Sequence, residues 1–417
     1  MGDFEAWTAK PVLERLALYL VFVAYAVIGF LKAPGDDLSS SYVGCRLLAA
    51  GNGGHLYDFH PDLFRVVDTP AWVNAAAEAG FTGFLHPYVQ TPLWAWMLQP
   101  VCSRLTFDAF AVIFLCIAAV SLAATIEIVA RSWAGKFLRP LPLSILLLAI
   151  AISTPFQYAM WLVQTHALFL LMTVLALSLA ERGRAVAPGA LLAVACAVKI
   201  TPGFLLLYWL AGGRFRAVVW FVVFLLVLAA MTVAVAGPDL MLDYVQSLRR
   251  VSNVLLVAFN NQSLAAWLGY SSGMEAEVEN WRMLPLTAAL KLTSLAAAII
   301  GVTVSGWMSR RHAWRGAAAG VALISITMFT PIAWTHYFVS LIPAVMVLTN
   351  VGGVLPSAIA VAIFVLNARP VAVDPIAAEI GSIAIVRSHF FSAIILIVAL
   401  ILRCRLPDRL RYPPRST

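Results

Sequence analysis

Charged residues are scarce in this chain. Of its 417 residues, 12% are charged and 62% are apolar, whereas a soluble domain carries about 25% charged and about 45–50% apolar residues. Apolar runs of membrane-spanning length recur from Val12 to Ile401, and the short alternating segments of a transmembrane β-barrel are absent. The composition therefore predicts an all-α polytopic membrane protein, with residues 1–417 forming a single integral membrane domain.

Three further features of the sequence argue against a metal site, a cofactor and a nucleic-acid partner. The five cysteines have no metal-ligand spacing, so we expect no metal site and interpret the cysteines as small core hydrophobes. No glycine-rich phosphate loop is present, and we expect no cofactor. The net charge of +8 comes from short basic clusters between apolar runs, which is typical of cytoplasmic loops. We therefore expect no nucleic-acid partner.

The basic clusters also predict the topology. With the N-terminus inside, the positive-inside rule gives about 12 transmembrane helices and places both termini in the cytoplasm. The first extracytoplasmic loop is then 32–87, with short interfacial helices at 39–50 and 71–79. The segments 237–285 and 369–387 form further outer loops, and 403–417 is a basic cytoplasmic tail.

Two segments interrupt this pattern. Residues 88–105 are apolar but contain Pro92 and Pro100, so this segment could either span the membrane or re-enter it. Residues 188–212 contain Pro202 and Gly203, which predict two short helices in a hairpin broken near Lys199. Broken helices at membrane depth occur where they line a polar cavity.

On this topology the polar side chains gather at the outer face. Two adjacent carboxylates, Asp36 and Asp37, follow the first apolar run directly. A carboxylate at a membrane boundary is a candidate general base, although either aspartate could instead cap the helix that begins there. His55, Asp58 and His86 lie in the same loop but offer no ligand triad with firm spacing.

Soluble nucleotides are scarce outside a bacterial inner membrane, so an enzyme acting there can use a lipid-linked sugar donor. Such a reaction needs a base for the acceptor hydroxyl, cations for the leaving phosphate and an apolar groove for the lipid. The sequence offers candidates for all three.

Several motifs together resemble the GT-C membrane glycosyltransferases, most closely glycosyltransferase family 87, whose members use polyprenyl-phosphate mannose. They follow one another between about residues 36 and 345: Asp37-Leu38-x-x-x-Tyr42-x-x-x-Arg46 with Leu56-Tyr57-Asp58, Tyr88-x-x-x-Pro92-Leu93, Ala197-x-Lys199-x-x-Pro202, Asn261-Gln262-Ser263-Leu264, and Pro331-Ile332-x-Trp334-x-His336. The adjacent Asp36 and the Gly-Asn-Gly-Gly turn at 51–54 depart from the family pattern. The resemblance implies a GT-C-type helical bundle and an inverting transfer.

The resemblance also implies roles for individual residues. Asp37 would be the catalytic base, favoured over Asp36 by its spacing to Tyr42 and Arg46. Lys199 and His336 would bind the donor phosphate, although Lys199 could also be a snorkelling lysine and His336 a core histidine. Expected substrate-binding residues are Tyr88, Gln90, Gln164, His166, Asn261, Gln262 and Trp334. Arg249 and Arg250 are weaker candidates for an anionic acceptor.

We therefore expect a glycosyltransferase of the bacterial inner (plasma) membrane, with its active site facing the periplasm or cell exterior. Its partners would be a polyprenyl-phosphate sugar donor, mannose being the expected sugar, a lipid-linked or envelope glycan acceptor, and membrane lipids. The main alternative is a transporter or flippase for a lipid-linked saccharide. A transporter built from two halves should show matched helix interruptions, and none stands out. A non-catalytic assembly partner in envelope synthesis is a third possibility.

Overall fold

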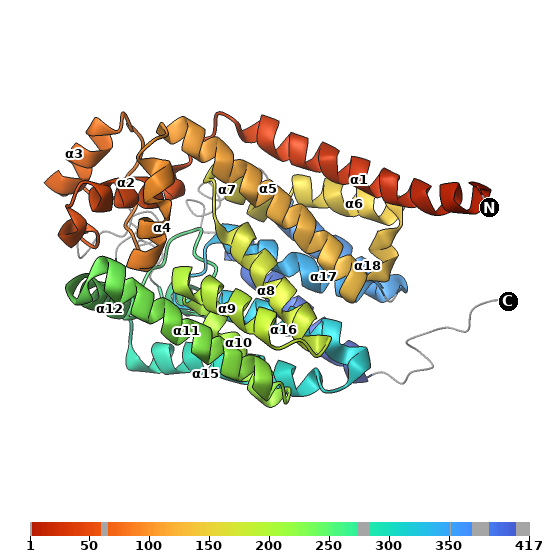
Figure 1. Ribbon diagram of the computed structural model, residues 1–417. Helices are drawn as coiled ribbons and strands as arrows, with labels where there is room; N and C mark the ends of the chain where they lie inside the picture. The colour runs from red at the N-terminus through yellow and green to blue at the C-terminus, as the bar shows by residue number, and fades with distance from the viewer. Residues whose placement is uncertain (1, 60–65, 274–282, 351, 369–382, 406–417) are drawn as a thin grey trace.

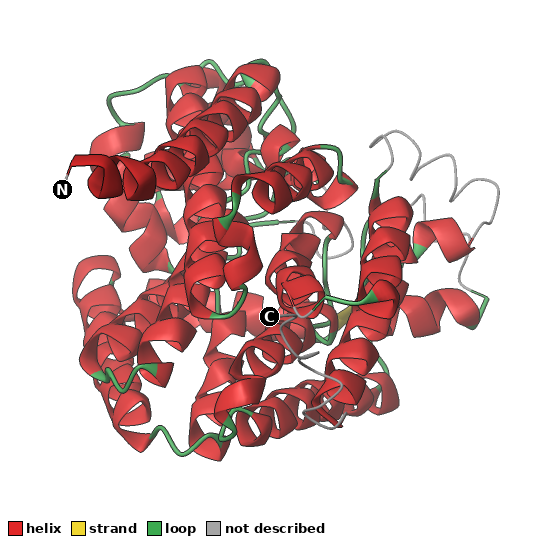
Figure 2. Ribbon diagram, turned by 90° about the vertical axis from the view of Figure 1, so that its right-hand side faces the viewer, coloured by secondary structure: helices red, strands yellow, loops and turns green. Residues whose placement is uncertain are grey.

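The chain folds into packed α-helices in a computed structural model that describes residues 2–59, 66–273, 283–350, 352–368 and 383–405. Figure 2 shows that helices account for nearly all of the regular structure. Within the described residues, four helices are long and apolar enough to cross a membrane. They are the apolar part of α1 (Gly2–Phe30), α5 (Phe107–Ser132), α11 (Phe215–Ala236) and α15 (Ala288–Met308).

A fifth candidate span is bent. It consists of two helices that meet at 63°, α6 (Pro140–Ala151) and α7 (Thr154–Trp161). The remaining apolar helices are shorter: α8 (His166–Glu181), α9 (Val186–Val198), η3 with α10 (Thr201–Phe204, Leu205–Ala211), α16 (Arg315–Met328), η5 with α17 (Thr335–Ser340, Leu341–Asn350), α18 (Val354–Asn367) and α21 (Ser388–Arg405). The structure thus confirms that the protein is helical. Four or five of its helices are candidate spans by length and composition, and the predicted total of about 12 spans stays a prediction.

Two helices occupy the positions where the sequence predicted short helices within the segment 32–87. They are α2 (Asp36–Ala49) and α3 (Pro70–Glu78). Short elements complete the connections: η1 (Gly53–His55), α4 (Pro92–Cys102), η2 (Gly135–Leu138), α12 (Pro238–Ser252), β1 (Val254–Leu255), α13 (Leu264–Ser271), β2 (Leu284–Pro285), η4 (His312–Trp314) and α20 (Ile383–Val386). Residues 369–382 of the predicted third outer segment, and 406–417 of the predicted tail, lie outside the described residues.

The segment 88–105, which could either span or re-enter the membrane, contains the short helix α4. Its 11 residues cover about 16 Å at 1.5 Å per residue, about half of a bilayer core. The helix packs against α2. A short antiparallel pairing of β1 with β2 connects residues 254–255 to residues 284–285, within the segment 237–285 that was predicted to be an outer loop.

The shorter helices α2, α3, α4 and α12 are grouped apart from three of the long apolar helices (Figure 1). In Figure 1, α2, α3, α4 and α12 gather at one end of the molecule, and α1, α5 and α11 run away from that end. Contacts between α2 and α4, and between α12 and α4, agree with this view. Segments from distant parts of the sequence, including the first loop and α12, are therefore brought to a common end.

Candidate active site

Helix α2 places the two adjacent carboxylates at its first turn. Gly35 precedes the helix with φ of 62°, a left-handed conformation that favours glycine, and its N–H donates to the carbonyl of Trp161. Gly35 occupies the N-cap position without a side-chain cap, so neither aspartate caps the helix as the alternative interpretation required. Asp36 and Asp37 instead occupy its first two positions.

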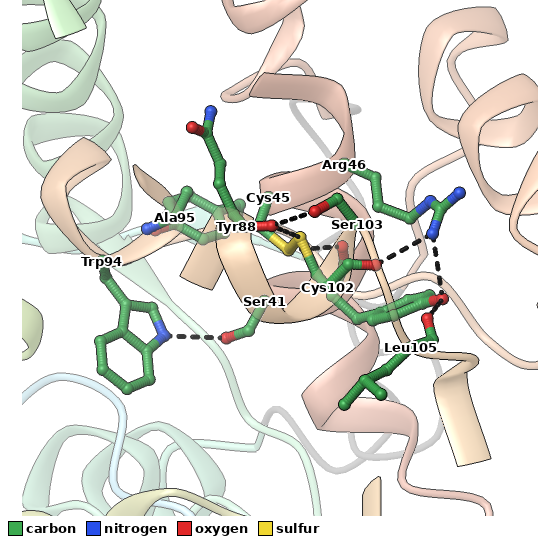
Figure 3. Close-up of a disulfide and its surroundings, with 11 residues drawn as sticks. Ser41, Cys45, Arg46, Tyr88, Trp94, Ala95, Cys102, Ser103 and Leu105 are labelled. Atoms are coloured by element: carbon green, nitrogen blue, oxygen red, sulfur yellow. Dashed lines mark hydrogen bonds between the residues drawn. A yellow bond between two sulfur atoms is a disulfide. The ribbon is translucent and has the colours of Figure 1, made fainter. Parts of the chain in front are cut away.

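A disulfide ties α2 to α4 (Figure 3). Cys45 and Cys102 are bonded, with their Cα atoms 6.5 Å apart. Trp94 donates to Ser41 Oγ at 3.1 Å, and Arg46 donates to the carbonyl of Cys102 at 3.0 Å. Both cysteines lie in the hydrophobic core, as the sequence predicted, but the prediction missed their bond to each other, because pairing across 57 residues leaves no mark on local spacing.

The first turn of α2 faces a large cavity of about 1050 Å³. Its wall comes from α2, the 84–90 segment, the α7–α8 connection, the break after α9, α12, α15, α16 and the 329–337 segment. Its apolar lining includes Phe30, Leu248, Val251, Leu295 and Phe329. The volume matches that of sites that enclose a small organic ligand, and the lining combines polar and apolar surface.

Asp37 is the centre of the polar part of this cavity. Gln164 Nε2 donates to Asp37 Oδ2. His336 Nε2 lies 3.9 Å from the same oxygen, and His86 Nε2 lies 3.4 Å from Oδ1. The Asp37 side chain keeps 22% of its surface exposed, and this surface faces the cavity.

The surroundings of Asp37 perturb its acidity. Burial raises the pKa of Asp37 and outweighs the opposing effects of His86, the Gln164 hydrogen bond and Lys199. The neighbouring carboxylate of Asp36 raises it further. A carboxylate with a raised pKa is a better proton acceptor than an ordinary aspartate.

Asp36 has a different environment. Its side chain is buried beside Gly83, and its pKa is raised by burial, with His86 and a backbone hydrogen bond from Phe84 acting against this effect. Asp36 also lines the cavity, but Gln164 and His336 are close to Asp37 instead. Of the two carboxylates, Asp37 is therefore the one that lies within reach of both Gln164 and His336.

Three basic side chains of the site contact one aromatic ring, that of Tyr337. Lys199 Nζ lies 3.2 Å from the ring centroid of Tyr337. His166 stacks on Tyr337 at 4.8 Å, and His336 meets it edge-on at 4.6 Å. Lys199 occupies the break between α9 and η3, where Pro202 predicted an interruption, and it lines the cavity. Tyr337 was missed in the sequence, although it directly follows His336.

Two histidines retain unused hydrogen-bonding capacity. Within the described residues, His336 Nε2 and both ring nitrogens of His166 are buried without a hydrogen-bond partner. Such atoms carry a desolvation cost unless a water or ligand satisfies them. His336 lines the main cavity, whereas His166 lines a small adjoining pocket together with Lys199 and Tyr337.

Of the other predicted substrate-binding residues, Gln90, Gln164 and Trp334 line the cavity. Tyr88 lies behind its wall, where its hydroxyl donates to Thr91 O at 2.7 Å and accepts from Ala95 N at 2.9 Å. Asn261 and Gln262 are fully buried outside the lining. These three residues therefore face the protein interior instead of the cavity.

Asn261 and Gln262 connect segments of the wall. Asn261 Nδ2 donates to Leu256 O, and its Oδ1 accepts from Ala333 N at 2.8 Å. Gln262 Nε2 donates to Val386 O at 2.6 Å. The preceding Asn260 lines the cavity in their place.

The remaining candidates lie away from the cavity. His55 and Asp58 form an exposed ion pair at 2.7 Å, and Arg250 stacks over Phe59. Arg249 does not contribute to the lining. In the described part of the chain, no group of three or more His, Cys, Asp or Glu side chains is arranged to hold a metal ion.

The fold and cavity define a class of protein. The chain is a helical protein with helices long and apolar enough to span a membrane, and its cavity is lined by a carboxylate, a lysine and apolar side chains. The family profile described as glycosyltransferase family 87 matches residues 88–304, just over half of the chain. The chain therefore belongs to glycosyltransferase family 87 and is a glycosyltransferase. A search of curated proteins gave no match.

The site contains residues from inside and from outside the region that the family profile matches. Lys199 and Gln164 lie inside the matched region, whereas Asp37 and His336 lie outside it. The contacts of Asp37 with Gln164 and His336 join these parts into one site.

Proposed function

We propose that this glycosyltransferase moves a sugar, with mannose as the expected one, from a polyprenyl phosphate to a lipid-linked or envelope glycan hydroxyl. The observation that carries the proposal is the position of Asp37 in a cavity that also holds Lys199 and an extensive apolar lining. The carboxylate suits the acceptor hydroxyl, the ammonium suits a phosphate, and the apolar wall suits an isoprenoid chain.

The proposed reaction is a single displacement. The acceptor oxygen attacks the anomeric carbon from the face opposite the phosphate, and Asp37 takes the proton of the acceptor hydroxyl. The bond between the anomeric carbon and the phosphate oxygen breaks, and the electron pair leaves on the phosphate. The anomeric centre is inverted, and one base is sufficient because the leaving group is already an anion.

Lys199 and His336 have complementary tasks in this step. Lys199 offers positive charge to the phosphate, whose negative charge grows as it departs. The unpartnered Nε2 of His336 is placed to hydrogen-bond a ligand oxygen near Asp37 Oδ2. Gln164 holds the Asp37 carboxylate, so that its orientation is set before the acceptor arrives.

We further propose a GT-C-type bundle of about 12 spans in a bacterial inner membrane. The site would face the periplasm or cell exterior. The disulfide between Cys45 and Cys102 supports this orientation, because disulfides persist in oxidising compartments and are rare in the cytosol. The disulfide lies on α2, the same helix as Asp37.

The test compares purified wild-type protein with Asp37→Asn and Asp36→Asn. Each is incubated with radiolabelled polyprenyl-phosphate mannose and membrane lipids, and labelled lipid product is counted. We expect Asp37→Asn to lower turnover by about 10²–10⁴-fold, the usual contribution of a positioned base. Asp36→Asn is the matched control, because it removes the adjacent charge and should keep most of the turnover. Equal turnover in all three proteins would refute the assignment of Asp37.

A further inference from the structure

A strained turn joins α7 to α8 beside the proposed base. Among the described residues, Val163 is the one non-glycine residue with a positive φ, at 50°. A left-handed backbone crowds the Cβ of an L-residue, and a β-branched side chain is rarely found there. Such a conformation costs free energy and is concentrated at functional sites, where the surrounding structure holds it in place.

The hydrogen bonds of this turn identify its type. Val163 N–H donates to Met160 O at 3.1 Å, and Gln164 N–H donates to Ala159 O at 2.9 Å. These are the two bonds of a Schellman motif at the end of a helix. In that motif the left-handed residue is usually glycine, and the residue after it frequently makes a hydrophobic contact. At the end of α7, valine and glutamine occupy these two positions.

Other helices of the chain end in the same motif with glycine. A glycine of positive φ follows α2, α3, α8 and α10, at Gly51, Gly80, Gly183 and Gly213. After each of them, the next N–H donates to the carbonyl five residues earlier, in the pairs Asn52 with Leu47, Phe81 with Ala76, Arg184 with Leu179, and Arg214 with Trp209. Helix α7 is therefore the exception among these five helices.

The side chain of Val163 packs beside the start of α2. It is 2% exposed, and a Cβ added to Gly35 would lie 3.3 Å from Val163 Cγ2. Gly35 directly precedes α2, has a left-handed backbone itself, and donates its N–H to Trp161 O at 3.3 Å. The two left-handed residues thus lie against each other, and glycine at position 163 would leave part of this contact unfilled.

The second unusual residue of the turn makes the contact with the base. Gln164 Nε2 donates to Asp37 Oδ2, and both Val163 and Gln164 line the cavity. An apolar residue at position 164 would suit the motif but could not make this hydrogen bond. Both departures from the usual motif therefore act on the same distance, between the Gln164 amide and the first turn of α2.

We propose that Val163 is a positioning residue for Asp37: its left-handed backbone turns Gln164 toward the carboxylate, and its side chain holds the turn against Gly35. This inference rests on the proposed function, in which Asp37 takes the proton of the acceptor hydroxyl. Val163 acts through Gln164 and has no part in the bonds that form and break.

Thermal unfolding of purified protein tests the strain without turnover. Val163→Ala and Val163→Gly both remove the contact with Gly35, but only alanine keeps a Cβ at a positive φ. We expect Val163→Gly to unfold at a higher temperature than Val163→Ala, because glycine adopts this conformation without strain. Val257→Ala and Val257→Gly are the matched controls, since Val257 is fully buried in a loop, has no positive φ and does not line the cavity. There the glycine variant should be the less stable one.

The pH dependence of kcat/KM tests the positioning. The Gln164 hydrogen bond lowers the pKa of Asp37, so a weaker bond should move the acid limb of the profile to higher pH. We expect Val163→Gly to move the limb by up to about one pH unit. The double variant Val163→Gly/Gln164→Leu should move it no further than Gln164→Leu alone, because both changes act through one contact. These variants keep the other ionisable side chains that face Asp37 within the described residues, which are Asp36, His86, Lys199, His336 and Tyr337.

Three results would overturn the inference: a lower unfolding temperature in Val163→Gly than in Val163→Ala, an unmoved acid limb in Val163→Gly, or additive shifts of the limb in the double variant. A role confined to packing would lower stability without moving the acid limb. Failure of the proposed function would appear separately, as unchanged turnover in Asp37→Asn, and the order of unfolding temperatures would still test the strain at Val163.

Discussion

The disulfide between Cys45 and Cys102 should stabilise the part of the protein that carries Asp37. The two cysteines are 57 residues apart, and the loop that they close contains α3 and most of the segment 32–87. Closing a loop of this length lowers the entropy of the unfolded chain by an amount worth ~4 kcal/mol at 25 °C. We therefore expect the double variant Cys45→Ser/Cys102→Ser to unfold at a lower temperature than the wild type.

Thiol counting and thermal unfolding check this prediction together. The chain has five cysteines, of which Cys116, Cys196 and Cys404 are free. Denatured protein treated with maleimide should carry three labels, and five after reduction. Cys116→Ser is the control, because it removes a free thiol on α5 and leaves the loop closed.

The double variant should also lose turnover. Cys45 lies on the same helix as Asp37, and without the disulfide α2 would be held to α4 by the Trp94 and Arg46 hydrogen bonds. Five labels on the unreduced protein, or an unchanged unfolding midpoint in the double variant, would refute the reasoning.

Four further outcomes are expected. Because burial raises the pKa of Asp37, turnover should fall on acidification through a pH above the usual aspartate range, where the base becomes protonated. Gln164→Leu removes a hydrogen bond that lowers this pKa, so the acid limb of the kcat/KM profile should move to higher pH, whereas an unmoved limb would contradict the contact. Lys199→Met should lower kcat by about 10²–10³-fold with partial recovery in Lys199→Arg, and a change confined to acceptor KM would argue against a role at the donor phosphate. Gly44→Ala should destabilise the protein by about 1–3 kcal/mol through overpacking, measured by thermal unfolding, because its Cβ would lie 2.9 Å from the Tyr88 ring.

The sequence by itself determined the class of the protein. Apolar runs at the membrane-spanning length identified the long helices, since a bilayer imposes that length on any chain that crosses it. Helices α2 and α3 and the break beside Pro202 were also predictable, because local turn and helix chemistry decides them. The order of the motifs resembles glycosyltransferase family 87, and the match over residues 88–304 shows that family.

Only the tertiary structure decided which polar residues form the site. Asp37, Gln164 and His336 are separated by long stretches of chain, and their contacts depend on how three segments pack. Packing also decides that the Asn261 side chain is buried in the cavity wall and that Lys291 lines the cavity. The pairing of Cys45 with Cys102 arose in the same way. Helical periodicity and hydropathy are local properties that the sequence carries, whereas the direction of a polar side chain is set by the neighbours that packing brings to it.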